Sequence, residues 1–342
     1  MLPFKVIYSD KYYLRLGEHV FPGEKYKLIH QHLLDTGVCE PSDFLEPEPA
    51  RDRDVLLVHG SEWVYKLQTG TLTAREELQL EVPYSAELVD AFWLSAGGSI
   101  LAGQKALENG IGINLGGGFH HAFPDHGEGF CMINDIAIAI RRLQRDQKIQ
   151  RALVVDCDVH QGNGTAVIFG QWRALALASE ALPSASPPLL RRTEHGSIRE
   201  LPPGDGMDVF TVSLHQDNNY PAFKPPSMID VNLPDAIDDE HYLGWLDNAL
   251  SSALRNFDPQ LISFVAGADP YKYDQLGGLN LSIEGLKRRD KFVFDVARTR
   301  GIPVMVTLAG GYAQEVEDTV AIHANTVVAA KEVFASSPPA TS

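Results

Sequence analysis

The sequence predicts an α/β protein built as a single domain around a doubly wound parallel sheet. Short apolar runs, typical of buried parallel strands, alternate with longer stretches that have helical spacing of apolar residues. Polar residues follow directly after four or five of the apolar runs. No internal repeat or linker divides the 342 residues, a length that one large α/β domain can span.

Residues 1–150 supply the first strands and helices of this pattern. Short apolar runs predict strands at residues 5–8, 55–58 and 111–114. Helical spacing predicts helices at residues 24–36, 62–68, 74–80, 86–109 and 133–145. Gly110 suits the C-terminal cap of the longest helix, because glycine readily adopts the left-handed conformation that ends a helix. Residues 40–53 are rich in proline and acidic residues and predict a loop.

Residues 151–342 continue the alternation. Strands are predicted at residues 152–155, 209–214, 231–234, 261–266 and 302–308. Helices are predicted at residues 239–256, 283–300 and 315–335, whereas residues 165–179 are helical or mixed. Residues 181–207 contain several prolines, and we expect a surface insertion there. The Pro/Ser tail at residues 336–342 is expected to be disordered, which leaves residues 1–335 as the domain.

The strand at residues 152–155 leads into the segment around which the chain is organised. Asp156, Asp158 and His160 occur there at positions i, i+2 and i+4. Alternate residues of a strand point to the same side, so these three groups can converge on one point. An isolated Asp-x-His is more often an ion pair or turn cap at a strand end. Matching chemistry after other strands favours a metal site instead.

Composition excludes several function classes. The 29 basic and 45 acidic residues give a formal charge of −16, which argues against a nucleic-acid surface and against an anionic membrane anchor. Three cysteines in a chain of this length do not form a disulfide framework, so a reducing compartment is expected. Neither a signal peptide nor an apolar run long enough to span a membrane is visible. These features predict a cytoplasmic protein.

Polar residues also follow other predicted strands: His120 and His121, His215, Asp269 and Tyr312. In open parallel sheets, ligands bind outside these carboxyl ends of the strands. Asp158, His160 and Asp269 would offer two oxygen ligands and one nitrogen, with positions left open for water and substrate, as in catalytic zinc sites. The same donor set permits Fe²⁺ or Mn²⁺.

Residues beside the predicted metal site could transfer protons. His120 and His121 lie on a glycine-rich loop and could supply a general base. Asp156 and Asn163 could orient their imidazole rings. Tyr312, on a Gly-Gly turn, could donate a hydrogen bond to a carbonyl oxygen as it becomes an oxyanion.

Six motifs occur here in the order found in the histone deacetylase superfamily, which the chain resembles from about Tyr8 to about Ala330. They are Gly-Gly-Gly-Phe-His-His, Gly-Phe-Cys, Asp-Cys-Asp-Val-His-Gln-Gly-Asn-Gly, Ser-Leu-His, Gly-Ala-Asp and Gly-Gly-Tyr. The His-Gln-Gly-Asn-Gly turn and the loop from Asp274 to Ser282 are most similar to class IV deacetylases and their bacterial relatives.

The resemblance implies an arginase/deacetylase-like fold, with residues 1–335 as the catalytic domain. It implies that Asp158, His160 and Asp269 hold Zn²⁺, and that His120, His121 and Tyr312 are catalytic. The remaining implied roles concern a structural K⁺ site and the walls of a substrate tunnel. Asp156 and Ser213 match the K⁺ positions, and Gly129, Phe130 and Tyr220 match the tunnel walls.

The chain departs from the family pattern in three places. Asn163 stands where class I enzymes have an aspartate, so one histidine would have a neutral orienting partner. The excursion at residues 181–207 is longer than in the class IV pattern. The aspartate at the tunnel rim of class I enzymes, which grips the substrate backbone, has no match in the motifs.

The expected function is metal-dependent hydrolysis of a linear amide. Water activated by the metal would attack, releasing an acetyl or longer acyl group from an amine such as Nε-acyl-lysine. An acetylpolyamine deacetylase is an alternative, but such enzymes can place an acidic residue near Leu276, where this chain is apolar. A ureohydrolase with two Mn²⁺ ions would need further bridging carboxylates. A non-catalytic acyl-lysine binder would be expected to lack a catalytic histidine or the tyrosine.

Overall fold

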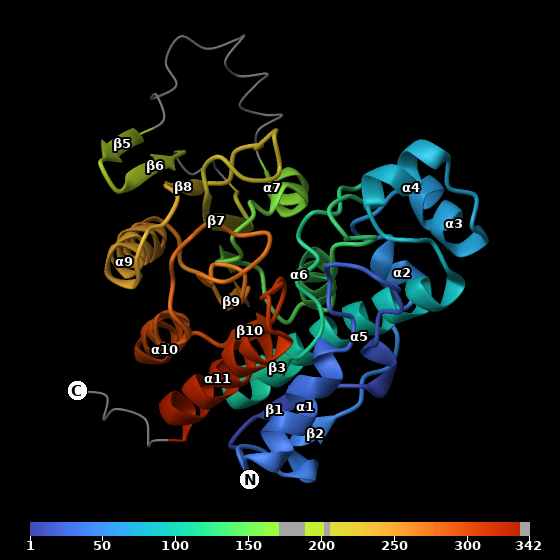
Figure 1. Cartoon of the computed structure of the whole chain (residues 1–342), viewed down its shortest axis with the longest axis horizontal. Coiled ribbons are helices and arrows are strands. Elements are labelled where there is room, and N and C mark those ends of the chain that lie inside the picture. The colour runs from blue at the N-terminus through green and yellow to red at the C-terminus, as the bar shows by residue number, and fades with distance from the viewer. Residues whose placement is uncertain (171–188, 202–205, 336–342) are drawn as a thin grey trace.

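A computed structural model describes residues 1–170, 189–201 and 206–335. Its centre is a ten-stranded sheet with the order β2-β1-β3-β10-β9-β4-β7-β8-β6-β5 (Figure 1). All neighbours from β2 to β8 in this order are parallel, which confirms the predicted fold class. The strands are β1 (Lys5–Ile7), β2 (Phe44–Leu45), β3 (Ile111–Asn114), β4 (Ala152–Asp156), β5 (Leu189–Thr193), β6 (Gly196–Glu200), β7 (Val209–Gln216), β8 (Ile229–Leu233), β9 (Leu261–Val265) and β10 (Val304–Thr307).

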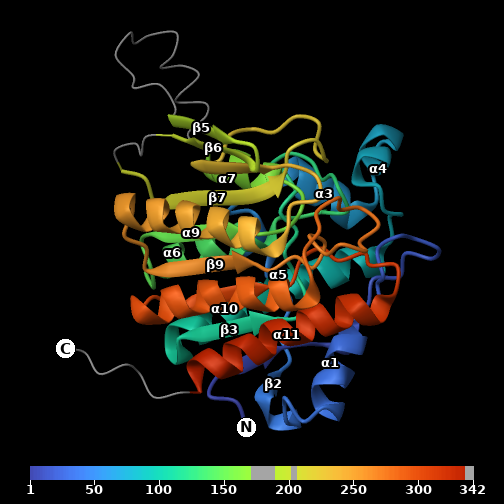
Figure 2. The same cartoon turned by 60° about the vertical axis from the view of Figure 1, so that its left-hand side comes forward.

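Helices cover both faces of the sheet. In Figure 2, α9, α10 and α11 lie in front of the strands, and α5, α6 and α7 lie behind them. The long loops gather at the end toward which the parallel strands point, where ligands bind in such sheets. The helices are α1 (Lys25–Asp35), α2 (Asp52–Val55), α3 (Ser61–Thr69), α4 (Ala74–Leu80), α5 (Ala86–Asn109), α6 (Asp135–Arg145), α7 (Asn163–Phe169), α9 (Asp239–Asn256), α10 (Ile283–Thr299) and α11 (Val316–Phe334), with short 3₁₀ turns at Asp10–Tyr12 and Pro41–Asp43.

The longest helix, α5, has the predicted bounds because both of its ends are encoded locally. The Ser85 hydroxyl accepts a hydrogen bond from the Leu88 N–H at 3.1 Å and so caps the N-terminus. Gly110 ends the helix with φ +84°, the left-handed conformation that glycine adopts without steric cost. Between these caps, the residues from Ala91 to Ile100 are all buried, so this part of the helix lies inside the core.

The strand predicted at residues 55–58 is wrong. This segment is the end of α2 and a helical turn, in which the His59 N–H donates to the Val55 carbonyl at 3.0 Å. The helix buries Asp54, which forms 2.8 Å ion pairs with Arg142 and Arg145 of α6. A four-residue apolar run cannot by itself distinguish a strand from a helix, and the distant arginines decide between them. The predicted loop at residues 40–53 instead contains the edge strand β2.

Part of the predicted insertion at residues 181–207 extends the sheet. β5 and β6 form an antiparallel hairpin, and β6 pairs antiparallel with β8. The sheet is therefore mixed at this edge, which the prediction of a purely parallel sheet missed. Residues 181–188 and 202–205 of the insertion, and the tail at residues 336–342, lie outside the described residues.

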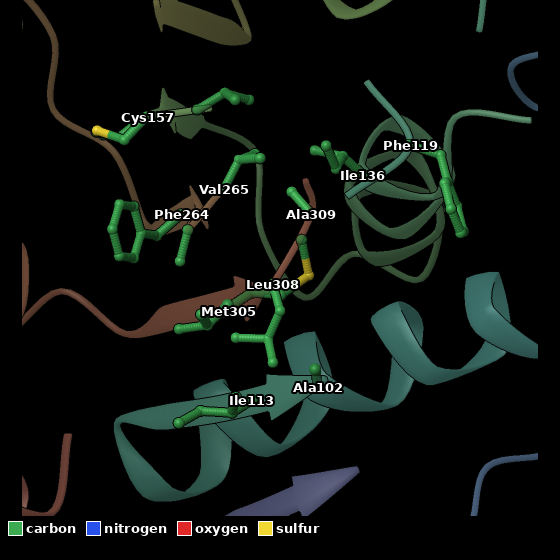
Figure 3. Packing of buried hydrophobic residues seen from close by; sticks show 14 of the residues in the cluster. Ala102, Ile113, Phe119, Ile136, Cys157, Phe264, Val265, Met305, Leu308 and Ala309 are labelled. Atoms are coloured by element: carbon green, nitrogen blue, oxygen red, sulfur yellow. The ribbon is translucent and has the colours of Figure 1, made fainter. Parts of the chain in front are cut away.

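Close backbone packing between α5 and the sheet forms the middle of the core (Figure 3). A Cβ atom at Gly112 in β3 would lie 2.1 Å from the carbonyl oxygen of Ala102 in α5. At Gly103, a Cβ atom would lie 3.1 Å from the sulfur of Met305 in β10. Glycines at these two positions let the helix approach β3 and β10, so the loops at the ends of these strands stay close together.

A buried arginine connects the loops that follow β4 and β9. The Arg289 guanidinium Nη1 donates to the carbonyl oxygens of Cys157 at 3.1 Å and Gly267 at 2.6 Å. Its charge is balanced by Asp290, with 2.8 Å between Nη2 and Oδ1. Asp290 in turn accepts a 2.6 Å hydrogen bond from the Thr326 hydroxyl. This network holds two irregular loops in one arrangement.

Arg289→Met is expected to destabilise the protein by about 3–5 kcal/mol, because it leaves a buried carboxylate unpaired and two carbonyls without their donor. Urea unfolding would measure the change. The neighbouring Arg288→Met variant is the control, since the ion pair of Arg288 with Glu240 is exposed. Equal stability of the two variants would contradict the assigned role of Arg289.

Candidate active site

The predicted site residues meet in the loops that follow β4, β9 and β10. The alternating pattern predicted that Asp158 and His160 continue the strand. β4 instead ends at Asp156, so both residues lie in the loop that follows it. Asp156 Oδ1 accepts a hydrogen bond from the Asp158 N–H at 3.1 Å, and Asp158 Oδ1 accepts one from the His160 N–H at 3.0 Å. Such bonds between an aspartate and the backbone two residues later form tight turns. These turns bring Asp158 and His160 together.

Asp158, His160 and Asp269 are buried, and one possible ligand atom from each lies within 4.8 Å of the others. His160 Nδ1 is 3.0 Å from Asp158 Oδ1 and 3.4 Å from Asp269 Oδ2. Within the described part of the chain, Asp269 Oδ2 finds no hydrogen-bond donor. Burial, and then the neighbouring charge of Asp158, raise the pKa of Asp269 to about 7. A cation among the three side chains would offset both the burial of the carboxylates and the repulsion between them, so this group fits a metal ion.

Backbone groups hold the two carboxylates and leave space beside them. The Gly310 N–H donates to Asp158 Oδ2 at 3.0 Å, and the Val159 N–H donates to Asp269 Oδ1 at 2.8 Å. A Cβ atom at position 310 would lie 2.1 Å from Asp269 Oδ2 and 2.6 Å from Asp158 Oδ2. Only glycine therefore fits at this position.

The two adjacent histidines have different partners. His120 Nδ1 is 2.7 Å from Asp156 Oδ2, whereas His121 Nδ1 is 2.8 Å from the side-chain oxygen of Asn163. Their Nε2 atoms lie 3.1 Å apart. Burial opposes the charged form of His120, but Asp156 and Asp158 outweigh it and raise its pKa to about 9. Burial, and then the charge of His120, lower the pKa of His121 well below its usual range.

Tyr312 lies across the pocket from the histidines on the turn after β10. Asp274 Oδ2 accepts a hydrogen bond from the Tyr312 N–H at 2.7 Å and so holds this turn. The Tyr312 ring packs against Phe130 and His160, with ring centroids 6.0 and 6.4 Å apart. Burial and nearby carboxylates, first among them Asp158, raise the pKa of the Tyr312 hydroxyl well above its usual range. The phenol is therefore a hydrogen-bond donor.

The predicted tunnel walls line a pocket that leads to these groups. Gly129, Phe130 and Tyr220 line a space of about 210 Å³ together with His121, His160 and Tyr312. A Cβ atom at Gly129 would lie 2.7 Å from the His121 ring and 3.0 Å from the Tyr220 ring. A smaller space of about 20 Å³ adjoins the same residues and extends to His120 and Asp158. All predicted catalytic, metal and tunnel residues are thus brought together.

Comparison with known proteins matches this arrangement to one family. The histone deacetylase domain model matches residues 19–328. The chain belongs to the histone deacetylase family. It is 36% identical over 332 residues to an uncharacterized protein of Picosynechococcus sp., covering 97% of this chain and 99% of that one. It is 30% identical to histone deacetylase 2 of Arabidopsis thaliana, covering 90% of this chain and 74% of that one.

Solved structures support the fold of this deacetylase-family chain. The HDAC homolog from Aquifex aeolicus has a TM-score of 0.74 at 22% identity and matches 98% of this chain and 85% of its own. The family assignment implies a hydrolase that acts on an acylated substrate. No helix within the described ranges is long and apolar enough to cross a membrane.

Three residues near the deacetylase site were missed by the sequence analysis. Glu81, which ends α4 in the left-handed conformation, lines the mouth of the pocket. Glu128 hydrogen-bonds to Asn163 and Tyr220. Lys25 is buried and donates to the Ala309 carbonyl at 2.6 Å, and burial lowers its pKa to about 8. No spacing pattern identifies them, although a charged residue just before Gly-Phe-Cys could have drawn attention to Glu128.

The structural K⁺ site stays a prediction. Asp156 and Ser213, which match the K⁺ positions of the family, are paired neighbours across β4 and β7. The Ser213 hydroxyl lies 2.9 Å from His215 Nδ1, so it already has one partner.

Gly310→Ala is expected to lower the affinity for divalent cations by about 10- to 100-fold, because the added methyl group displaces both carboxylates. Isothermal titration with Zn²⁺ would measure it. Gly244→Ala is the matched control, since a Cβ atom there meets nothing within 4 Å. Identical Zn²⁺ affinity of the two variants would show that the space at Gly310 is not needed for the metal.

Proposed function

We propose that this chain is a metal-dependent deacetylase that removes an acetyl group from an amine such as Nε-acetyl-lysine. The observation that carries this proposal is the buried Asp158–His160–Asp269 group beside a pocket that also holds two histidines and a tyrosine; among the described residues, Asp269 Oδ2 has no hydrogen-bond donor. One donor nitrogen and two carboxylates suit Zn²⁺, and Fe²⁺ is possible with the same donors.

Asp158, His160 and Asp269 would hold the cation. When bound, it supplies Lewis acidity, which activates water and polarises the amide carbonyl. The protein's own residues do the remaining work: they position the amide and move protons. Each of these tasks can be assigned to side chains whose contacts are described above.

The histidine pair would transfer the protons. His121 has a lowered pKa and an Nδ1–H that is positioned to donate to Asn163, so its Nε2, 3.1 Å from His120 Nε2, carries the lone pair that can accept a proton from water. His120 carries the raised pKa and is held by Asp156. The leaving amine needs a proton when the C–N bond breaks, and the paired imidazoles can deliver it.

Tyr312 would stabilise the negative charge that develops on the carbonyl oxygen. Its raised pKa keeps the hydroxyl protonated at neutral pH, as a donor must be. The aromatic contacts with Phe130 and His160 hold the ring at the pocket wall. Such preorganised donors contribute more in a buried site than in water, because they need little reorganisation.

The size of the inner space favours acetyl over long acyl groups. The space of about 20 Å³ beside His120, Asp158 and Tyr312 is close to what one water molecule or methyl group needs. A long acyl chain would require this region to open. Removal of longer acyl groups is therefore the less favoured form of the reaction.

Acetylated polyamines are a second candidate substrate, and Glu81 is the observation that favours them. Glu81 is one of the residues that line the pocket, so its carboxylate could pair with a second ammonium group of the substrate. Leu276, at the position where polyamine deacetylases can carry an acid, lines the same pocket and counts against this candidate. The two candidate substrates differ in whether a second positive charge on the substrate, distant from the amide, contributes to binding.

The proposal is tested by measuring hydrolysis of fluorogenic acyl-lysines of increasing chain length beside acetylated polyamines, with metal analysis of the same sample. We expect the highest kcat/KM for an acetylated substrate and about one divalent ion per chain. Absence of hydrolysis of every compound by the metal-loaded protein would refute the deacetylase proposal.

Tyr312→Phe is expected to retain the bound metal but to lower kcat by about 100- to 1,000-fold, because one oxyanion donor is lost. Steady-state kinetics and metal content would be measured on the same preparation. Turnover equal to that of the unmodified enzyme would remove Tyr312 from the catalytic residues.

Asp269→Asn is expected to lower the metal content strongly, because the variant loses one charged ligand while it keeps the shape of the side chain. Inductively coupled plasma mass spectrometry after dialysis would measure the content. Full occupancy in this variant would exclude Asp269 from the ligand set. Asp274→Asn, which changes a nearby carboxylate outside the Asp-His-Asp group, is the comparison variant.

A further inference from the structure

Glu128 stands at the centre of a hydrogen-bond network behind the histidine pair. Its Oε1 atom accepts hydrogen bonds from the Asn163 side-chain amide and from the Tyr220 hydroxyl, the latter at 3.1 Å. Its Oε2 atom accepts from Gln79 Nε2 at 3.1 Å and lies 3.6 Å from His126 Nε2. The carboxylate is therefore fixed by donors on both oxygens, although the chemistry described so far gives it no role.

These contacts determine which way the Asn163 amide faces. A carboxylate can only accept, so Asn163 must present its NH₂ group to Glu128. The Asn163 oxygen then faces His121 Nδ1 at 2.8 Å and also accepts from the Gly164 N–H at 3.0 Å. The reversed amide would place its oxygen against the carboxylate and its NH₂ group against two N–H donors.

The orientation of Asn163 in turn selects the tautomer of His121. Because an oxygen faces Nδ1, the ring proton is held on Nδ1, and Nε2, which lies 3.1 Å from His120 Nε2, keeps its lone pair. With the other tautomer, Nε2 would carry the proton and could not accept one. The Gly164 N–H holds the oxygen of the Asn163 amide and the Glu128 carboxylate holds its NH₂ group, so both ends of the amide resist turning over.

We propose that Glu128 is a positioning residue that holds His121 in its proton-accepting tautomer through Asn163. The inference rests on the proposed deacetylase function, in which His121 is the base. It assigns to two side chains, Glu128 and Asn163, the orienting role that Asp156 fulfils alone for His120. The carboxylate is also tied to Tyr220, so one residue aligns both the base and a wall of the pocket.

The proposal predicts an unusual response to exchange of the two residues. Asn163→Asp alone would place two carboxylates in contact, so kcat should fall by about 10- to 100-fold. Glu128→Ala should cause a similar loss, because the amide is no longer held. The double variant Asn163→Asp/Glu128→Gln restores one carboxylate and one amide in exchanged positions, and its kcat should exceed that of Asn163→Asp by at least about 10-fold.

Steady-state kinetics on acetyl-lysine would be measured with metal content and thermal stability for each variant. Glu77→Gln, an exposed residue on α4, is the control for an unrelated loss of charge and should behave like the unmodified protein. Rescue of kcat by the double variant, at unchanged metal content and thermal stability, supports the proposal, because a merely structural role of Glu128 would alter those two measurements. An unchanged kcat in Glu128→Ala, or no rescue, would overturn it.

A second measurement does not depend on activity. Long-range ¹H–¹⁵N spectra of histidine-labelled, metal-free protein report the tautomer of each ring, and the His121 signals are those lost in His121→Ala. The Nδ1–H tautomer is expected in the unmodified protein, with a shift toward Nε2–H in Glu128→Ala. An unaltered tautomer would overturn the inference even if the protein hydrolysed none of the substrates, so its failure can be told apart from failure of the proposed function.

Discussion

The close approach of two buried carboxylates, Asp158 and Asp269, is the constraint on which the site depends. Like charges in a poorly polarisable interior repel strongly, so such a pair persists only with compensation. Backbone N–H groups of Val159 and Gly310 and the imidazole of His160 provide part of it. The sheet makes the approach possible, because β4 and β9 are neighbours in register and end side by side.

The two histidines next to this pair also depend on neighbouring carboxylates. His120 lies against a full carboxylate, whereas His121 lies against an amide that is itself held by the carboxylate of Glu128. Two chemically identical rings, whose Nε2 atoms lie 3.1 Å apart, thereby acquire opposite pKa shifts. The difference in surroundings is what allows adjacent imidazoles to take different roles in proton transfer.

Features encoded in contiguous residues were predicted well. The bounds of α5 and α9 agree with their spacing and capping signals, and strands β3, β4, β7, β9 and β10 lie where apolar runs were found. Errors arose where distant residues decide local structure. Residues 55–58 joined a helical turn because α2 pairs with arginines of α6, and β5 and β6 extended the sheet because β8 offered an edge.

The sequence by itself determined the predominantly parallel sheet class, the succession of strands along the chain and the residue types after each strand, because these are read from local periodicity and motifs. Only the tertiary structure decided that Glu81 reaches the pocket, that Lys25 is buried beneath it, and that Glu128 holds Asn163. The physical reason is that these contacts join loops separated by many residues. Their geometry depends on how helices and strands pack, and no local pattern records it.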